Sequence, residues 1–173
     1  MSSIPVLETE RLVLREHRPE DLEAYQSLWS DPAVTRFTSR TPINREQAWG
    51  RIMQFHGMWK LCGYGMWIVE EKVTASLLGE VGLLERRREI QPSLKGTIEA
   101  GWMLVPSVHG RGIAREAMES VFSWAGKAHP GATYSCIINP ENEASLKLAG
   151  RLGFAESART TYQGHPTVIL RRR

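Results

Sequence analysis

The chain has 173 residues, 42% of them hydrophobic, which is the size and composition of one domain that can bury a substantial core. We therefore expect a single domain over residues 1–173. The formal charge is only +3, because 22 basic residues are nearly balanced by 19 acidic ones. This excludes a typical nucleic-acid binder, which carries a basic stripe or a row of aromatic stacking residues.

The cysteines and the hydropathy of the chain further limit the class of protein to which it can belong. The two cysteines, Cys62 and Cys136, match no metal-ligand spacing, so no metal site is predicted. No apolar stretch approaches the ~18 residues of a membrane span, and the N-terminus lacks the basic and apolar regions of a signal peptide. We expect a cytoplasmic protein without membrane contact. Cys136 should pack as a small buried hydrophobe, because it lies in the apolar run YSCII.

In chain order, the first third predicts one strand and two helices. Apolar residues among charged ones favour a strand over residues 7–16. Pro19 suits the first turn of a helix over 19–29, whose apolar residues recur at helical spacing. Asn44 is expected to cap a longer helix over 45–60.

After this helix the hydrophobic period changes. Three strands are predicted over residues 66–70, 77–85 and 97–105, and the polar segments between them are typical of hairpin connections. A helix should begin at Gly112, because its apolar residues recur every four positions, as on a helix that packs on a sheet.

The last third alternates strand and helix again. A strand is predicted over 133–138, and Asn139-Pro140 should start a helix that ends at Leu152, before Gly153. Two strands follow, over 154–162 and 167–171, with a turn between them. The order β-α-α-β-β-β-α-β-α-β-β implies a mixed sheet with helices on both faces.

The most informative stretch is IEAGWMLVPSVHGRGIAREA, residues 98–117, a strand that turns into a helix. Gly110 and Gly112 allow a tight turn. The helix start presents unpaired N–H groups and the positive end of the helix dipole, and Arg111 and Arg115 add charge. These features predict a site for a phosphorylated cofactor. The alternative is an ordinary strand-to-helix turn, since neither a Walker loop nor a dinucleotide fingerprint is present.

A second stretch, IINPENEASLKLAGRLGF at residues 137–154, makes the pattern specific. The order of strand, HGRGIA loop and helix, then strand, NxxS and a helix ending in LGF resembles the GNAT-type N-acetyltransferases, above all their ribosomal-protein N-acetyltransferase branch. LETERLVLREHRPEDLEAY, LLGEVGL and IEAGWML resemble that branch too, so the resemblance covers nearly the whole chain. It implies one α/β domain whose mixed, mostly antiparallel seven-stranded sheet is flanked by helices on both faces.

The resemblance also implies an activity. Acetyl-CoA would be the co-substrate, and a primary amine of a protein N-terminus or a small molecule would attack it directly in a ternary complex. The alternative is a non-catalytic acyl-CoA sensor, because His109 stands where the family pattern has Gln or Arg. A homodimer is compatible with the sequence.

The family pattern assigns the cofactor contacts residue by residue. The loop would hold the pyrophosphate, the preceding strand would pair with the pantetheine arm, and Asn142 would hydrogen-bond that arm. Asn142 could instead be a polar residue that serves the helix start. The cofactor residues predicted in this way are Met103, Leu104, Val105, Gly110, Arg111, Gly112, Ile113, Ala114, Arg115 and Asn142.

The catalytic candidates are acid–base groups. Glu99 is predicted as the base that deprotonates the amine, with Glu80 as its rival and His109 as a further candidate. Ser145 could protonate the departing thiolate or orient a water. Each could equally be a structural residue of the sheet or of a helix surface. The family builds its acceptor site around residues 19–60, where Trp49, Phe55, His56 and Trp59 line it or belong to the core.

Overall fold

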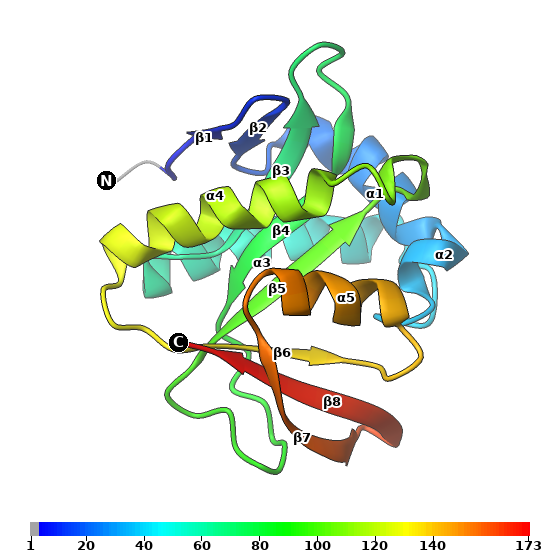
Figure 1. Ribbon diagram of the computed structural model, residues 1–173. Coiled ribbons are helices and arrows are strands. Elements are labelled where there is room, and N and C mark those ends of the chain that lie inside the picture. The colour runs from blue at the N-terminus through cyan, green and yellow to red at the C-terminus, as the bar shows by residue number, and fades with distance from the viewer. Residues whose placement is uncertain (1–3) are drawn as a thin grey trace.

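The computed structural model describes residues 4–173, which form one sheet of eight strands with helices on both faces (Figure 1). The strands are β1 (Leu7–Glu8), β2 (Leu12–Arg15), β3 (Met66–Glu71), β4 (Leu77–Leu84), β5 (Ile98–Leu104), β6 (Tyr134–Ile138), β7 (Ala155–Tyr162) and β8 (His165–Arg172). The helices are α1 (Leu22–Ser30), α2 (Pro32–Thr35), α3 (Arg45–Cys62), α4 (Ile113–Ala128) and α5 (Glu143–Arg151), with 3-10 turns η1 (Pro19–Asp21) and η2 (Pro106–Val108).

The strand order is β1-β2-β3-β4-β5-β6-β8-β7, and neighbours are antiparallel except for β5 and β6, which are parallel. The mixed, mostly antiparallel sheet is therefore confirmed. It has eight strands rather than seven because the predicted first strand is divided. A turn in which the Thr9 N–H donates to the Leu12 carbonyl (3.0 Å) separates β1 from β2.

The core lies on both faces of the sheet. Helices α4 and α5 cover one face and α1–α3 the other (Figure 1). The two apolar rows predicted for the helix after Gly112 are buried almost completely, as expected for a helix packed on a sheet. Asn44 caps α3 as predicted, since its side chain accepts from the Gln47 N–H (2.9 Å).

The start of α5 differs from the prediction. Asn139 does not cap the helix, because its side-chain oxygen accepts from the Glu141 N–H (2.8 Å) and closes a turn before the helix. The cap is Asn142, whose side-chain oxygen accepts from the Ser145 N–H (3.2 Å). The helix ends at a left-handed Gly153 (φ 83°), as expected.

The hairpin between β7 and β8 is tighter than predicted. Only Gln163 and Gly164 have positive φ angles, 50° and 78°, so the turn is short and β8 begins at His165. The sequence placed His165 in the turn, whereas the pairing puts it opposite Tyr162 in the sheet. Within residues 4–173, no helix is both long enough and apolar enough to cross a membrane.

Candidate active site

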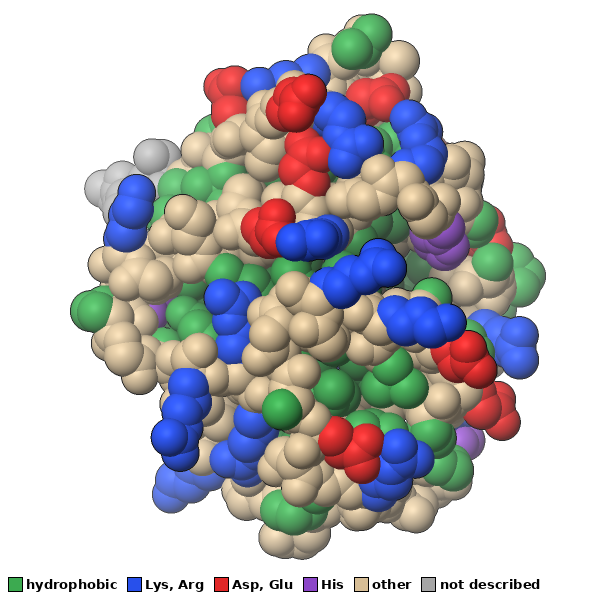
Figure 2. Space-filling model, viewed as in Figure 1, with side chains coloured by type: hydrophobic (Ala, Val, Ile, Leu, Met, Phe, Trp, Pro, Cys, Tyr) green, Lys and Arg blue, Asp and Glu red, His purple; other side chains and the backbone are tan. Residues whose placement is uncertain are grey.

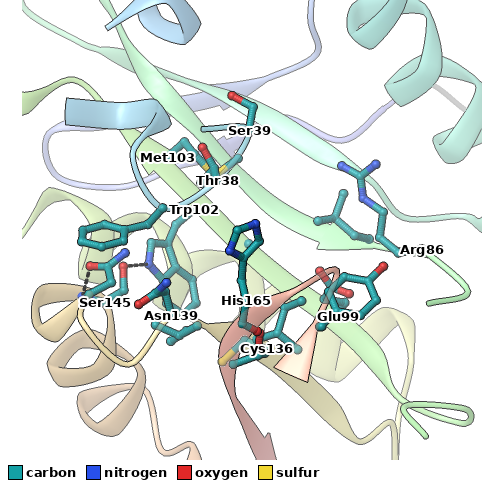
Figure 3. A pocket seen from close by; sticks show the side chains of 18 of the residues that line it. Thr38, Ser39, Arg86, Glu99, Trp102, Met103, Cys136, Asn139, Ser145 and His165 are labelled. Atoms are coloured by element: carbon teal, nitrogen blue, oxygen red, sulfur yellow. Dashed lines mark hydrogen bonds between the residues drawn. The ribbon is translucent and has the colours of Figure 1, made fainter. Parts of the chain in front are cut away.

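The candidate site is the gap where β5 and β6 separate. The two strands pair only where Ile98 lies opposite Tyr134 and Glu99 opposite Ser135. Beyond that point β5 stays paired with β4 and β6 with β8, so the two strands diverge. A cavity of about 340 Å³ opens there, lined by both strands, by α5 and by the β7–β8 hairpin (Figure 3).

The register decides which backbone groups of β5 face this gap. The Ile98 N–H donates to the Thr133 carbonyl (2.9 Å), so the polar groups of Ile98 point toward β6. The backbone N–H and C=O groups of successive residues point to opposite sides of a strand. The backbone groups of Ala100, Trp102 and Leu104 therefore also point toward the gap.

Met103 and Leu104, the last two residues of β5, and the next residue, Val105, were predicted to bind the pantetheine arm. The backbone groups of Leu104 face the gap, whereas Met103 is paired opposite Glu80 of β4 and the Val105 N–H donates to the Leu78 carbonyl (2.8 Å). The side chain of Met103 nevertheless lines the cavity. Trp102 is the residue that the sequence reasoning missed, because a strand pattern does not show which neighbour each peptide group faces.

The α4 start presents free donors at the end of β5. Gly112 precedes the helix in a left-handed conformation (φ 76°), and no side chain of the described residues caps it. Helices α3 and α5, by contrast, have asparagine caps. The N–H groups of the first turn of α4, at Ile113 and Ala114, therefore remain available to an anion.

Basic side chains surround this helix start. Figure 2 shows several on the face that carries the starts of α4 and α5. The side chains of Arg111, Arg115 and Lys147 are each more than half exposed. The partners of Arg115 and Lys147 are exposed carboxylates, and the contact of Arg111 with Glu71 is long (3.9 Å). Such ion pairs contribute little, so these cations stay available to a phosphate group.

A third arginine, Arg11, holds the loop in place and was not predicted. Its guanidinium contacts the Glu116 carboxylate (2.6 Å) in the first turn of α4 and donates to the Arg111 carbonyl (3.0 Å). Burial raises the pKa of Glu116, but hydrogen bonds from Thr9 and Arg11 outweigh it and lower that pKa. The contact joins residues more than a hundred positions apart, so no local pattern signals it.

Asn142 and Ser145 meet Trp102 at one end of the cavity (Figure 3). The Trp102 indole N–H donates to the Ser145 hydroxyl oxygen (3.2 Å). The hydroxyl proton of Ser145 is thus left to donate elsewhere. The amide NH₂ group of Asn142 is likewise free, because its oxygen makes the helix cap.

Glu99 and Arg88 form an ion pair at the other end of the cavity. Arg88 Nε lies 2.6 Å from one carboxylate oxygen and Nη2 lies 2.7 Å from the other. Burial lowers the pKa of Arg88, but the hydrogen bond and charge of Glu99 outweigh it and raise that pKa. The side chain predicted as the base therefore lines the cavity with both oxygens engaged.

Glu80, the predicted rival base, lies in the core between β4 and α1. It is fully buried and is not among the residues that line the cavity. Its oxygens accept from His17 Nε2 (3.0 Å), the Tyr25 hydroxyl (3.1 Å) and the Trp29 indole (3.2 Å). Burial, and then the charge of Glu80, raises the pKa of Tyr25 well above its ordinary value. These contacts give Glu80 the surroundings of a structural residue.

We expect Glu80→Ala to lower the free energy of unfolding by about 3–5 kcal/mol, because three buried donors lose their acceptor. Urea titration measures this loss. The matched control is Glu89→Ala, which removes an exposed carboxylate and should change the free energy by less than about 0.5 kcal/mol. A stable Glu80→Ala protein with a large loss of turnover would instead make Glu80 catalytic.

His165 is a functional candidate that the sequence reasoning did not select. It is half-buried at the start of β8 and lines the cavity, and its ring stands between Trp102 and Glu99 in the view of Figure 3. Its imidazole has no hydrogen-bond partner among residues 4–173. His109 differs, since its Nε2 donates to the Leu104 carbonyl (3.0 Å).

Cys136 lies in the wall of the same cavity but is 2% exposed. Burial, and then the nearby charge of Glu99, raises the pKa of the Cys136 thiol above its ordinary range. The expectation that Cys136 is a buried strand residue is confirmed. A thiol that stays protonated is a poor nucleophile, so the geometry favours direct transfer between two bound substrates over an acylated cysteine.

The model of the acetyltransferase (GNAT) domain matches residues 11–155. The chain belongs to the GNAT acetyltransferase family. It is 29% identical to YoaA of Bacillus subtilis, named an uncharacterized N-acetyltransferase, over 87% of this chain and 82% of YoaA. The family and these homologues establish acetyl transfer as the activity and do not favour the sensor alternative.

Solved structures of GNAT acetyltransferases share the fold. The crystal structure of the acetyltransferase from Agrobacterium tumefaciens superimposes with a TM-score of 0.83, at 26% identity over 100% of this chain and 96% of that one. RimL, a ribosomal L7/L12 acetyltransferase solved with coenzyme A, has a TM-score of 0.79 at 16% identity, with 97% of each chain covered. At that identity the likeness concerns the fold alone.

Proposed function

We propose that this GNAT acetyltransferase binds acetyl-CoA along the gap between β5 and β6 and transfers the acetyl group to a primary amine. The observation that carries the proposal is the continuous path from the open edge of β5 to the uncapped start of α4. Backbone groups at Trp102 and Leu104 would pair with the amides of the pantetheine arm. The N–H groups at Ile113 and Ala114 would receive the pyrophosphate, beside Arg111 and Arg115.

The transfer proceeds by direct attack. The amine nitrogen forms a bond to the thioester carbonyl carbon, and the bond from that carbon to sulfur breaks. The Ser145 hydroxyl, which is free to donate, hydrogen-bonds to the departing thiolate, and the thiolate becomes the free thiol with the proton that is removed from the amine. Alignment of both substrates in one complex supplies much of the rate.

We assign proton removal from the amine to His165. Imidazole is the side chain best suited to accept a proton near neutral pH, and that of His165 faces the cavity without a partner. Glu99 is the alternative, but the bidentate contact with Arg88 engages both of its oxygens. In this assignment Glu99 positions Arg88.

The experiment that tests the proposal measures free thiol released from acetyl-CoA across an amine library, with mass spectrometry of the acetylated products. Amine-dependent thiol release with a stoichiometric N-acetylated product supports the proposal. Tight binding of acetyl-CoA without any thiol release would contradict it and restore the sensor alternative.

Asn142 allows cofactor binding to be separated from helix capping. Asn142→Asp keeps a cap oxygen but removes the amide donor, so it should weaken CoA binding two- to tenfold, about 0.5–1.5 kcal/mol. The melting temperature of the free protein should hold or rise, because a carboxylate suits a helix start. Calorimetry of CoA binding and thermal melts measure the two effects.

Asn142→Ala is the matched variant, and it should lose both functions. The free protein should lose about 0.5–2 kcal/mol, the usual cost of a missing cap, and bind CoA as weakly as Asn142→Asp. If Asn142→Asp binds CoA like the parent, Asn142 is a cap residue only.

A further inference from the structure

The side chains that line the cavity carry more positive than negative charge. Among its lining residues are four arginines, Arg40, Arg51, Arg86 and Arg88, and one carboxylate, Glu99. Figure 3 shows Arg86 and Glu99 at one end, with Trp102 and Ser145 at the other and His165 between them. The lining of the cavity is therefore electropositive.

Only one of these arginines is neutralised by a carboxylate of the cavity. Arg88 holds both oxygens of Glu99, so that pair contributes little net charge. Glu80 is close to this region, but its oxygens contact His17, Tyr25 and Trp29 rather than an arginine. Arg51 and Arg86 therefore have no direct contact with a carboxylate among residues 4–173.

Arg51 and Arg86 are placed to bind an anion. The Arg51 guanidinium lies over the Trp29 ring, 3.8 Å from its centroid, and this stacking fixes its position. Neither arginine has an ion-pair partner in the part of the chain that the structure describes. The pKa of Arg86 is lowered, first because the surrounding protein displaces water and then because Arg88 and Arg51 repel its charge, although Glu99 and Glu80 oppose this. A bound anion would relieve that repulsion.

We infer that the acceptor of this acetyltransferase is an anionic primary amine, whose carboxylate or phosphate group binds Arg86 and Arg51 while its amino group lies beside His165. Guanidinium groups suit both oxyanions because their N–H donors match the spacing of the oxygens. A diamine would place a second positive charge against these arginines. The inference rests on the proposed function and adds the chemical class of the acceptor.

Acceptor pairs that differ only in the anionic group test this inference. Thiol release from acetyl-CoA is compared for amino acids and their decarboxylated amines, for 4-aminobutyrate and butylamine, and for phosphoethanolamine and ethanolamine. We expect the anionic member of a pair to have a kcat/KM at least about tenfold higher, the factor that a charged hydrogen bond supplies. Preference within the carboxylate pairs or within the phosphate pair identifies the anion. Equal or higher kcat/KM for the amines that lack the anionic group would overturn the inference.

Two variants test whether Arg86 is responsible for the preference for an anionic amine. Arg86→Gln should raise the KM for the preferred anionic amine about tenfold, leave kcat within about twofold and leave CoA affinity unchanged. Arg87→Gln removes the same charge one residue further along the chain, at a side chain that does not line this cavity. It should change neither the KM for the amine nor kcat. Equal KM values for Arg86→Gln and the parent enzyme would overturn the inference.

A binding measurement keeps the inference separate from catalysis. Glutarate and inorganic phosphate are titrated by calorimetry into the CoA-loaded parent and into Arg86→Gln, and binding of one anion should weaken at least about fivefold in the variant. If no amine releases thiol, the proposed function fails, and this titration alone decides whether the arginines form an anion site. If neither anion binds the parent, that site is absent.

Discussion

His165→Asn is expected to lower kcat/KM at pH 7 by roughly 10²–10⁴, the range typical of a lost general base. The imidazole lines the cavity and has no hydrogen-bond partner among the described residues, so its ring nitrogen is available to an incoming amine. Asparagine keeps the polar character and most of the width of histidine. The melting temperature and CoA affinity should therefore stay close to those of the parent.

Glu99→Gln discriminates between the two candidate bases. Glu99→Gln should cost less than about tenfold and act mainly on the KM for the amine, because it releases Arg88. If Glu99→Gln lowers kcat/KM by 10² or more while the kcat/KM of His165→Asn stays near that of the parent, Glu99 is the base.

Gly112→Asp is expected to weaken CoA binding about 10- to 1000-fold, or ~1.4–4 kcal/mol. The change places a carboxylate at the uncapped start of α4, where the pyrophosphate should lie. Like charges about 4 Å apart repel by amounts of this order near a protein surface. Calorimetry of CoA binding at low and at high salt measures the effect, and salt should reduce it.

Gly112→Asn is the matched control. Asparagine has nearly the same shape as aspartate and also tolerates the positive φ angle of 76°. A Cβ at this position would meet only the end of Arg11, at 3.6 Å, so the backbone has room for either side chain. The difference between the two variants isolates the charge. Equal CoA affinity in both would place the pyrophosphate elsewhere.

Features that depend on a few neighbouring residues could be predicted from the sequence alone. The helix after Gly112, the cap at Asn44 and the stop at Gly153 all follow from local spacing and local backbone preference. Such signals need no knowledge of distant segments, because hydrophobic period, caps and glycine conformation act within one or two turns. The order of the elements and the loop that is typical of the family could therefore be predicted from the sequence.

The tertiary structure decided what depends on residues far apart in the chain. Glu80 and Glu99 are both strand carboxylates in the sequence, yet one is buried under α1 and the other pairs with Arg88 at the cavity. Strand register directs the peptide groups of Trp102 rather than those of Met103 toward the gap, and a two-residue turn brings His165 into the site. A one-residue change of register reverses every side chain and peptide group of a strand, so only the assembled sheet determines which of these groups meet.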